Sequence, residues 1–239
     1  LSASSEESLF NEKTLSWARG HYLSRRFPDA ALVASGSQIA SDLPGYGRYL
    51  GAFVPILDLL NHSTAKSSCV SNYCEKQGAA AVQIFAGDCD LQPGDELTFS
   101  YGDIPNEHLL HAYGFCLKDN EFDTVSFTMR TSPTDAFMCT LKRGGFSEVP
   151  AEMWQFMSGE QGDAENVEIG IEEIEILLHF VSNKLQQVTT ALQKLPHNNC
   201  TEITYIKLYM EGQHEILKEL YLDLQGTVDQ FSSYEEDAE

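Results

Sequence analysis

Apolar residues recur at three- and four-residue spacings along two stretches of the second half of the chain, a pattern that predicts helices. The first stretch runs from Glu165 to Leu195 and stops before Pro196, which cannot continue a helix. The second runs from Thr201 to Phe231. One of its faces carries Ile206, Tyr209, Ile216 and Leu220. The short polar link between the two predicts an antiparallel helical hairpin.

The part of the chain before about residue 133 has shorter and more varied segments. Leu9 to Phe27 has the pattern of a helix that ends before Pro28, whereas Ser35 to Tyr49 is rich in Gly and Ser and is typical of a loop. The apolar positions of this helix are Phe10, Leu15, Trp17, Tyr22 and Leu23. A short helix is expected over Asn106 to Tyr113.

Strand patterns lie in the same part of the chain. The expected strands are Ala80 to Phe85, Glu96 to Tyr101 and Asp123 to Met129. Gln92 to Asp95 predicts a type II turn, because Pro93 presets the first central position and Gly94 supplies a positive φ. The fold class is therefore α+β: a mostly-β domain with a helical insertion over 1–132, followed by an all-α domain over 133–239.

Composition limits the classes of protein. The chain has 239 residues, of which 42% are hydrophobic and 21% charged, as expected of one or two folded domains. No apolar run approaches the length of a membrane span. The formal net charge of -21 repels phosphate backbones, so direct nucleic-acid binding is not expected, and a basic protein segment would be attracted. The alternative is that this charge only keeps the protein soluble.

The six cysteines form no C-x-x-C pair, so no metal site is expected. They are also not the framework of a small disulfide-rich protein, and a reducing compartment fits them better. We expect an intracellular location, cytoplasmic or nuclear, with a plastid as a further option. The oligomeric state is left open.

Four short motifs occur in a fixed order. They are Trp17-Ala18 with Ser24-Arg25-Arg26-Phe27; Asp58-Leu59-Leu60-Asn61-His62; Gly94-Asp95-Glu96-Leu97 leading to Tyr101-Gly102; and Asn106-x-x-Leu109-Leu110-x-x-Tyr113-Gly114-Phe115. Each alone has an ordinary structural explanation, such as a helix end or a packed aromatic. Asp58 is the exception, because a carboxylate within an apolar run is costly to bury without partners.

Together the motifs resemble the SET-domain protein methyltransferases, in the branch similar to the Rubisco large-subunit lysine methyltransferases. The resemblance extends from about Leu15 to Phe127, and the rest of the chain resembles that branch's helical substrate-binding domain in character and position. It implies a protein-lysine N-methyltransferase that uses S-adenosyl-L-methionine. The partner would be a protein substrate with a basic or lysine-bearing segment.

The resemblance assigns cofactor-binding roles to Arg25, Asn61, His62 and Tyr113. The guanidinium of Arg25 suits the carboxylate of the donor's methionine end, and the amide of Asn61 suits its amine. The backbone of His62 would meet the adenine. Tyr113 would form part of an aromatic wall, whose ring face attracts cationic groups.

Tyr101 is the expected catalytic residue, because its hydroxyl can orient the attacking amine beside the methyl group. For the substrate lysine, the resemblance implies the backbone carbonyls of Ser24, Arg25 and Asp58, together with Tyr113. Lysine must lose its proton before attack, and desolvation in a narrow aromatic channel lowers its pKa.

One family feature is missing from the expected position. Members carry a Gly-x-Gly segment on an early strand, whereas Gly45-Tyr46-Gly47 follows the Arg25 motif and lies in another context. Because the chain also begins with Leu1, we expect that an N-terminal portion is absent. We further expect this chain alone to bind the donor weakly or not at all.

Two alternatives remain open. Related enzymes of the same fold methylate histidine, but they lack the tyrosine that stands at Tyr113. A catalytically inactive SET-like module that binds a basic peptide is the other, although the retained motif residues argue against it.

Overall fold

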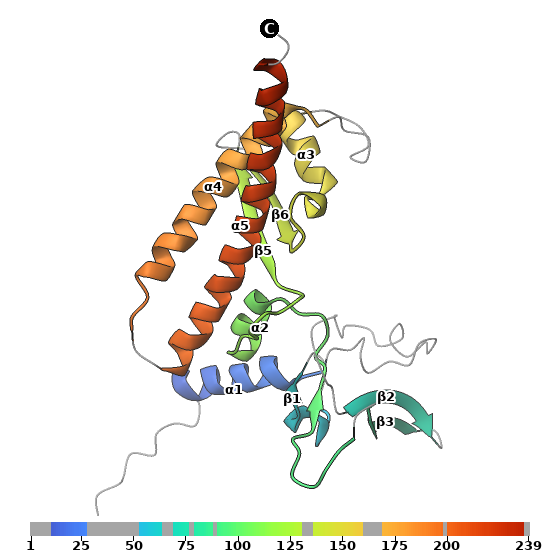
Figure 1. Ribbon diagram of the computed structural model, residues 1–239. Coiled ribbons are helices and arrows are strands. Elements are labelled where there is room, and N and C mark those ends of the chain that lie inside the picture. Colours follow the sequence, from blue (N-terminus) through green and yellow to red (C-terminus); the bar gives the residue numbers. More distant parts are fainter. Residues whose placement is uncertain are drawn as a thin grey trace, which may run out of the picture. The chain divides into compact units, whose positions relative to one another are not determined.

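The computed structural model describes residues 11–27, 53–63, 69–76, 79–87, 90–130, 136–159, 169–197 and 200–236 (Figure 1). The chain forms two compact units, Leu1–Asp103 and Ile104–Glu239. Helices and strands occur in both, which confirms the predicted α+β class. The part after residue 133 is mainly helical but not all-α as predicted, because Ala136–Lys142 forms a strand that pairs with Thr124–Arg130. The predicted loop at Ser35 to Tyr49 and the Gly45-Tyr46-Gly47 segment lie outside the described residues.

The first unit contains one described helix and a small sheet. Its elements are α1 (Glu12–Arg25), β1 (Asn61–His62), β2 (Cys69–Lys76), β3 (Ala79–Ala86) and β4 (Thr98–Phe99). The sheet order is β1-β4-β2-β3: β2 and β3 are antiparallel, while β4 pairs in parallel with both β1 and β2. The sheet therefore brings the Asn61-His62 motif next to the strand that leads to Tyr101.

Helix α1 has the predicted type, and it begins where the Asn11 side chain accepts a hydrogen bond from Thr14 N at 3.0 Å. Its apolar face differs from the expectation. No residue of α1 is buried, and Leu15 and Trp17 are 58% and 62% exposed. The apolar spacing therefore identifies the helix without identifying a covered face.

Two further local predictions have different outcomes. The turn at Gln92 to Asp95 is confirmed, because Asp95 N donates to Gln92 O at 3.1 Å and Gly94 has φ +101°. The strand expected from Glu96 to Tyr101 is shorter and contains only Thr98–Phe99. Its partner β1 is itself two residues long and β2 meets it at Phe99 alone, so within the described ranges no strand faces the residues that flank Thr98–Phe99.

The second unit is a helical hairpin packed on a two-stranded ribbon. Its elements are α2 (Asn106–Tyr113), β5 (Thr124–Arg130), β6 (Ala136–Lys142), α3 (Ala151–Ser158), α4 (Ile171–Gln193) and α5 (Thr201–Glu236). The two long helices lie side by side, as predicted (Figure 1). The predicted alternation of β5 is also confirmed: Val125, Phe127 and Met129 are buried and the residues between them are exposed.

The core of this unit joins the ribbon to the hairpin. Its central side chains include Val125, Met129, Leu177, Val181, Leu217 and Leu224, each fully buried. Residues 104–130 thus pack with the helices, although the sequence placed them before the domain boundary at 132/133. That boundary, as a division of function, stays a prediction.

Candidate functional site

The centre of the candidate site in the first unit is the turn that leads into β1. Ile56 has φ +77° and ψ -49°, a conformation that a β-branched residue rarely adopts. The 3-10 turn Leu57–Leu59 (η3) follows, and the side chain of Leu57 is buried, with 2% of its surface exposed. Asp58 N donates a hydrogen bond to Val54 O at 2.9 Å. Strained backbone of this kind is concentrated at functional sites, so the turn is a candidate on geometry alone.

Arg25 ties the end of α1 to this turn. Its Nη1 donates to the backbone carbonyl of Asp58 at 2.5 Å, across 33 residues of sequence. The Ser24 hydroxyl bonds within the helix, to Gly20 O at 2.8 Å. Ser24 and Arg25 lie in the last turn of α1, whose carbonyls have no donor within the helix and carry the negative end of its dipole. The carbonyls assigned to the lysine amine therefore share one neighbourhood.

Tyr101 is fixed against the same segment by two hydrogen bonds. Its hydroxyl donates to the carbonyl of Leu60 at 2.8 Å, and its backbone N–H donates to Nδ1 of His62 at 3.0 Å. Its ring centroid lies 5.0 Å from that of His62 and 6.1 Å from that of Phe99. Because the hydroxyl proton is committed to Leu60, the lone pairs of the oxygen can accept from another group.

The ring of His62 has a structural role that the sequence did not predict. Nδ1 accepts from Tyr101, so the neutral ring carries its proton on Nε2. Burial lowers the pKa of His62, and a backbone hydrogen bond with Phe99 opposes this in part. Ser63 N donates to Phe99 O on β4, so the backbone groups of His62 point away from β4. That direction is compatible with the role expected of the His62 backbone.

The lowered pKa of His62 predicts that the protein loses stability in mild acid. Between its folded pKa and the ordinary value near 6.5, the unfolded state binds more protons, so stability is present above about pH 6.5 and falls as pH drops below it. Thermal melts between pH 5 and 8 should show this decline. In His62→Asn, whose amide oxygen takes the place of Nδ1 and can still accept from Tyr101, the decline should be smaller. An equal decline in both proteins would contradict the assignment.

Asn61 has a partner that the sequence analysis missed. Its Nδ2 donates to Oε1 of Glu96 at 2.6 Å, and both residues are exposed. Asn61 pairs with Thr98 across the parallel strands, which brings Glu96 alongside. The position of Glu96 two residues before β4 was visible in the sequence, but its pairing with β1 was not. A carboxylate beside an amide suits a ligand ammonium group.

Tyr113 lies in the second unit, at the end of α2. Gly114 follows it with φ +80°, and its N–H bonds to the carbonyls of Leu109 and Leu110, which closes the helix. The Tyr113 ring lies 6.1 Å from the His108 ring and 6.3 Å from the Phe115 ring. The helix end expected at Gly114 is thus observed. The convergence of Tyr113 with the residues of the first unit stays a prediction.

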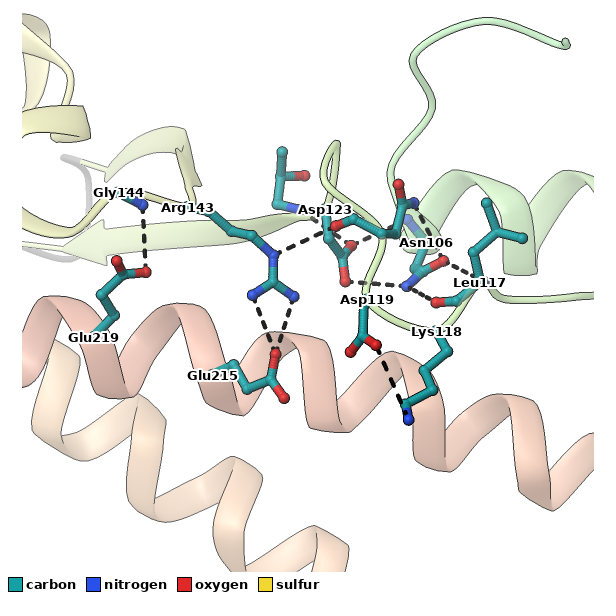
Figure 2. A network of polar contacts seen from close by, with 11 residues as sticks. Asn106, Leu117, Lys118, Asp119, Asp123, Arg143, Gly144, Glu215 and Glu219 are labelled. Atoms are coloured by element: carbon teal, nitrogen blue, oxygen red, sulfur yellow. Dashed lines mark hydrogen bonds and ion pairs between the residues drawn. The ribbon is translucent and has the colours of Figure 1, made fainter. Parts of the chain in front are cut away.

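A buried polar network fixes the start of α2, and no sequence pattern indicated it (Figure 2). Asn106 and Asp123 are 2% and 1% exposed. Burial raises the pKa of Asp123, while hydrogen bonds from Asn106 and Thr124 and the charge of Arg143 act against this. Every one of these groups belongs to the second unit.

Comparisons with known proteins agree with the motifs. Over 80 residues the chain is 35% identical to the ribosomal lysine N-methyltransferase set10 of Schizosaccharomyces pombe, covering 34% of this chain and 14% of that protein. A crystal structure of the SET domain of LSMT bound to lysine and AdoHcy matches with a TM-score of 0.63 at 13% identity, over 92% of this chain and 58% of that one. The chain has the SET-domain fold.

A second solved structure, of Rubisco LSMT bound to sinefungin and monomethyllysine, matches this SET fold with a TM-score of 0.58 at 15% identity. The match covers 92% of this chain and 57% of the Rubisco LSMT chain. The resemblance inferred from the motifs is therefore confirmed. No family model matches the chain, and the chain spans about a seventh of the yeast relative and under two thirds of the solved structures.

No group of three or more His, Cys, Asp or Glu side chains within the described ranges is arranged to hold a metal ion. No helix of the described part of the chain combines the length and apolar character needed to cross a membrane.

Proposed function

We propose that this chain contributes the catalytic residues of an S-adenosylmethionine-dependent protein-lysine N-methyltransferase. The observation that carries the proposal is the pair of hydrogen bonds that fixes Tyr101. Its hydroxyl donates to Leu60 O, and its backbone N–H donates to Nδ1 of His62. An oxygen held in this way on Leu60, two residues after Asp58, can align an amine for attack. The SET fold and the motif order support this assignment.

The residues present fit the methionine end of the donor. Arg25 uses Nη1 on Asp58, and the guanidinium keeps further N–H donors for a carboxylate. Asn61 and Glu96 offer an amide oxygen and a carboxylate for an ammonium group. When bound, S-adenosylmethionine supplies a methyl group on a positively charged sulfur, which a lysine amine takes by in-line displacement.

The chain's own residues would prepare the lysine. A neutral amine has two N–H groups, so two of the carbonyls of Ser24, Arg25 and Asp58 would accept from it at a time and direct its lone pair at the methyl group. Tyr101 adds an acceptor oxygen on the same side. Tyr113 adds an aromatic face, which accommodates a charged or methylated amine. Desolvation favours the neutral amine, so no strong side-chain base is required.

For the substrate we propose a basic segment of a ribosomal protein. The yeast relative is named as a ribosomal lysine methyltransferase, and this chain carries a net charge of -21, which favours a basic partner. Lysine rather than histidine is proposed as the target because Tyr113 is present.

The test is a transfer assay of the full-length protein with tritiated S-adenosylmethionine and ribosomal proteins from cells that lack this gene. Acid hydrolysis and amino-acid analysis should then find the label in methylated lysine. Histones serve as the control of similar basic character, and they should take up much less label. Label in methylhistidine would overturn the choice of residue. Donor binding without transfer to any of these proteins would favour the inactive binding module.

A further inference from the structure

The Asn106 that opens the fourth motif has no part in the chemistry above, yet it is almost completely buried. Helix α2 follows Pro105, which provides no side-chain cap. The cap comes instead from Asp123, 17 residues later, whose Oδ1 accepts from Asn106 N at 3.0 Å and from Thr124 N at 3.1 Å. A carboxylate at this position satisfies an unpaired helix N–H and complements the helix dipole.

The side chain of Asn106 closes the segment that contains Tyr113. Its Oδ1 accepts from Leu117 N at 2.9 Å and its Nδ2 donates to Leu117 O at 3.0 Å. The same Nδ2 donates to Oδ2 of Asp123 at 3.1 Å. Only a carboxamide offers the acceptor and the two donors that these three bonds need. Residues 106–117 therefore form a loop fastened at both ends, with Tyr113 inside it.

The loop is in turn fixed to the rest of the second unit. Asn120 Nδ2 donates to Ile104 O at 2.9 Å and to Asn106 Oδ1 at 3.3 Å. Arg143 Nε donates to Asn120 O at 3.4 Å, and both terminal nitrogens of Arg143 donate to Glu215 Oε2 at 3.1 Å, which reaches α5 (Figure 2). Asn106, Asn120 and Asp123 are the buried part of this network, and their mutual hydrogen bonds favour one arrangement of the loop.

From these contacts we infer that Asn106 and Asp123 are positioning residues for Tyr113 in methyl transfer. The inference rests on the proposed function, which assigns the Tyr113 ring to the lysine. Asp123 fixes the first turn of α2, Asn106 fixes the chain just beyond Phe115, and Tyr113 lies between the two anchors. A shift of the ring by about 1 Å would lower turnover about 10- to 100-fold without removing a donor contact.

The test compares near-isosteric changes with a variant of equal stability loss. Asn106→Asp and Asp123→Asn each place like groups face to face, so each should lower kcat about tenfold or more and leave the Kd for S-adenosylmethionine within about twofold. The double variant exchanges the two groups. It restores one donor–acceptor pair but not the bond to Leu117 O, so its kcat should lie above both single variants and below the unaltered protein.

Val181→Ala is the matched control, because Val181 is fully buried in the core on α4 and its side chain takes no part in the hydrogen bonds of the network. It should lower the melting temperature by a similar amount and keep kcat within about twofold. Equal loss of kcat in Val181→Ala and Asp123→Asn at equal stability would overturn the inference.

Amide hydrogen exchange separates this inference from the proposed function. Residues 107–117 should exchange faster in Asn106→Asp than in Val181→Ala, whether or not the protein transfers methyl groups. Faster exchange together with no transfer by the unaltered protein would refute the proposed function and leave the anchoring intact. Unchanged exchange would refute the anchoring itself.

Discussion

Replacing Tyr101 with Phe is expected to lower kcat about 100-fold, the scale seen when one preorganised hydrogen-bonding group is removed from an active site. The ring would still pack beside Phe99 and His62, and the backbone bond to His62 Nδ1 would remain. What disappears is the oxygen that Leu60 O holds in place. That oxygen serves the transfer step, so the Kd for S-adenosylmethionine should stay within about twofold.

In the full-length protein, steady-state kinetics with ribosomal proteins would measure kcat, and calorimetric titration would measure the Kd for the donor. Tyr205→Phe on α5 is the control, because it removes the same atom from a residue outside the candidate site. Tyr101→Phe also leaves Leu60 O without its donor, so a stability loss of about 1 kcal/mol should accompany it. A kcat equal to that of Tyr205→Phe would remove Tyr101 from the mechanism.

The sequence predicted best where one local pattern decides the structure. The long helices α4 and α5, the alternating strand β5 and the turn at Gly94 each follow from spacing or from turn chemistry within a few residues. The length of β4 did not follow, because it depends on how many residues β1 offers as a partner. The exposure of α1 did not follow either, since spacing cannot show what covers a face.

The candidate site divides in the same way. Motif order indicated the site residues Arg25, Asp58, Asn61, His62 and Tyr101. In the structure Arg25 donates a hydrogen bond to the carbonyl of Asp58, and Tyr101 is hydrogen-bonded to Leu60 and His62. The partners Glu96 and Asp123 were missed. Glu96 accepts a hydrogen bond from Asn61, 35 residues away, and Asp123 accepts one from Asn106, 17 residues away. No local sequence pattern indicates contacts at such separations.

The acidity of the chain also has a partly structural explanation. Glu215, Glu219 and Asp223 follow one another at four-residue spacing on α5, so they lie on one face of the helix. Each accepts from the turn after β6: Glu215 from Arg143, Glu219 from Gly144 N at 3.3 Å and Asp223 from Phe146 N at 3.0 Å. These carboxylates hold a turn in place, so net charge alone does not measure the attraction for a basic substrate.

Gly212→Ala is expected to reverse the usual effect of this substitution in a helix. Inside α5, Ala would normally stabilise by about 0.5–1 kcal/mol because it reduces the conformational entropy of the unfolded chain. At Gly212 the added methyl group would overlap Oδ2 of Asp123, and it would lie 3.4 Å from Cγ of the same carboxyl group. Asp123 is 1% exposed and held by Asn106 and Thr124, so it has little room to move away.

The expected cost is a loss of about 2–4 kcal/mol in the free energy of unfolding, because displacing Asp123 leaves buried donors of Asn106 and Thr124 unpaired at about 1–3 kcal/mol each. Gly226→Ala on the same helix is the control, since a methyl group there meets nothing within 4 Å and should give the ordinary gain. Urea unfolding of both variants would measure the difference. Equal stability in the two would show that the contact between α5 and Asp123 is looser than the structure has it, and it would weaken the case that Asp123 fixes α2.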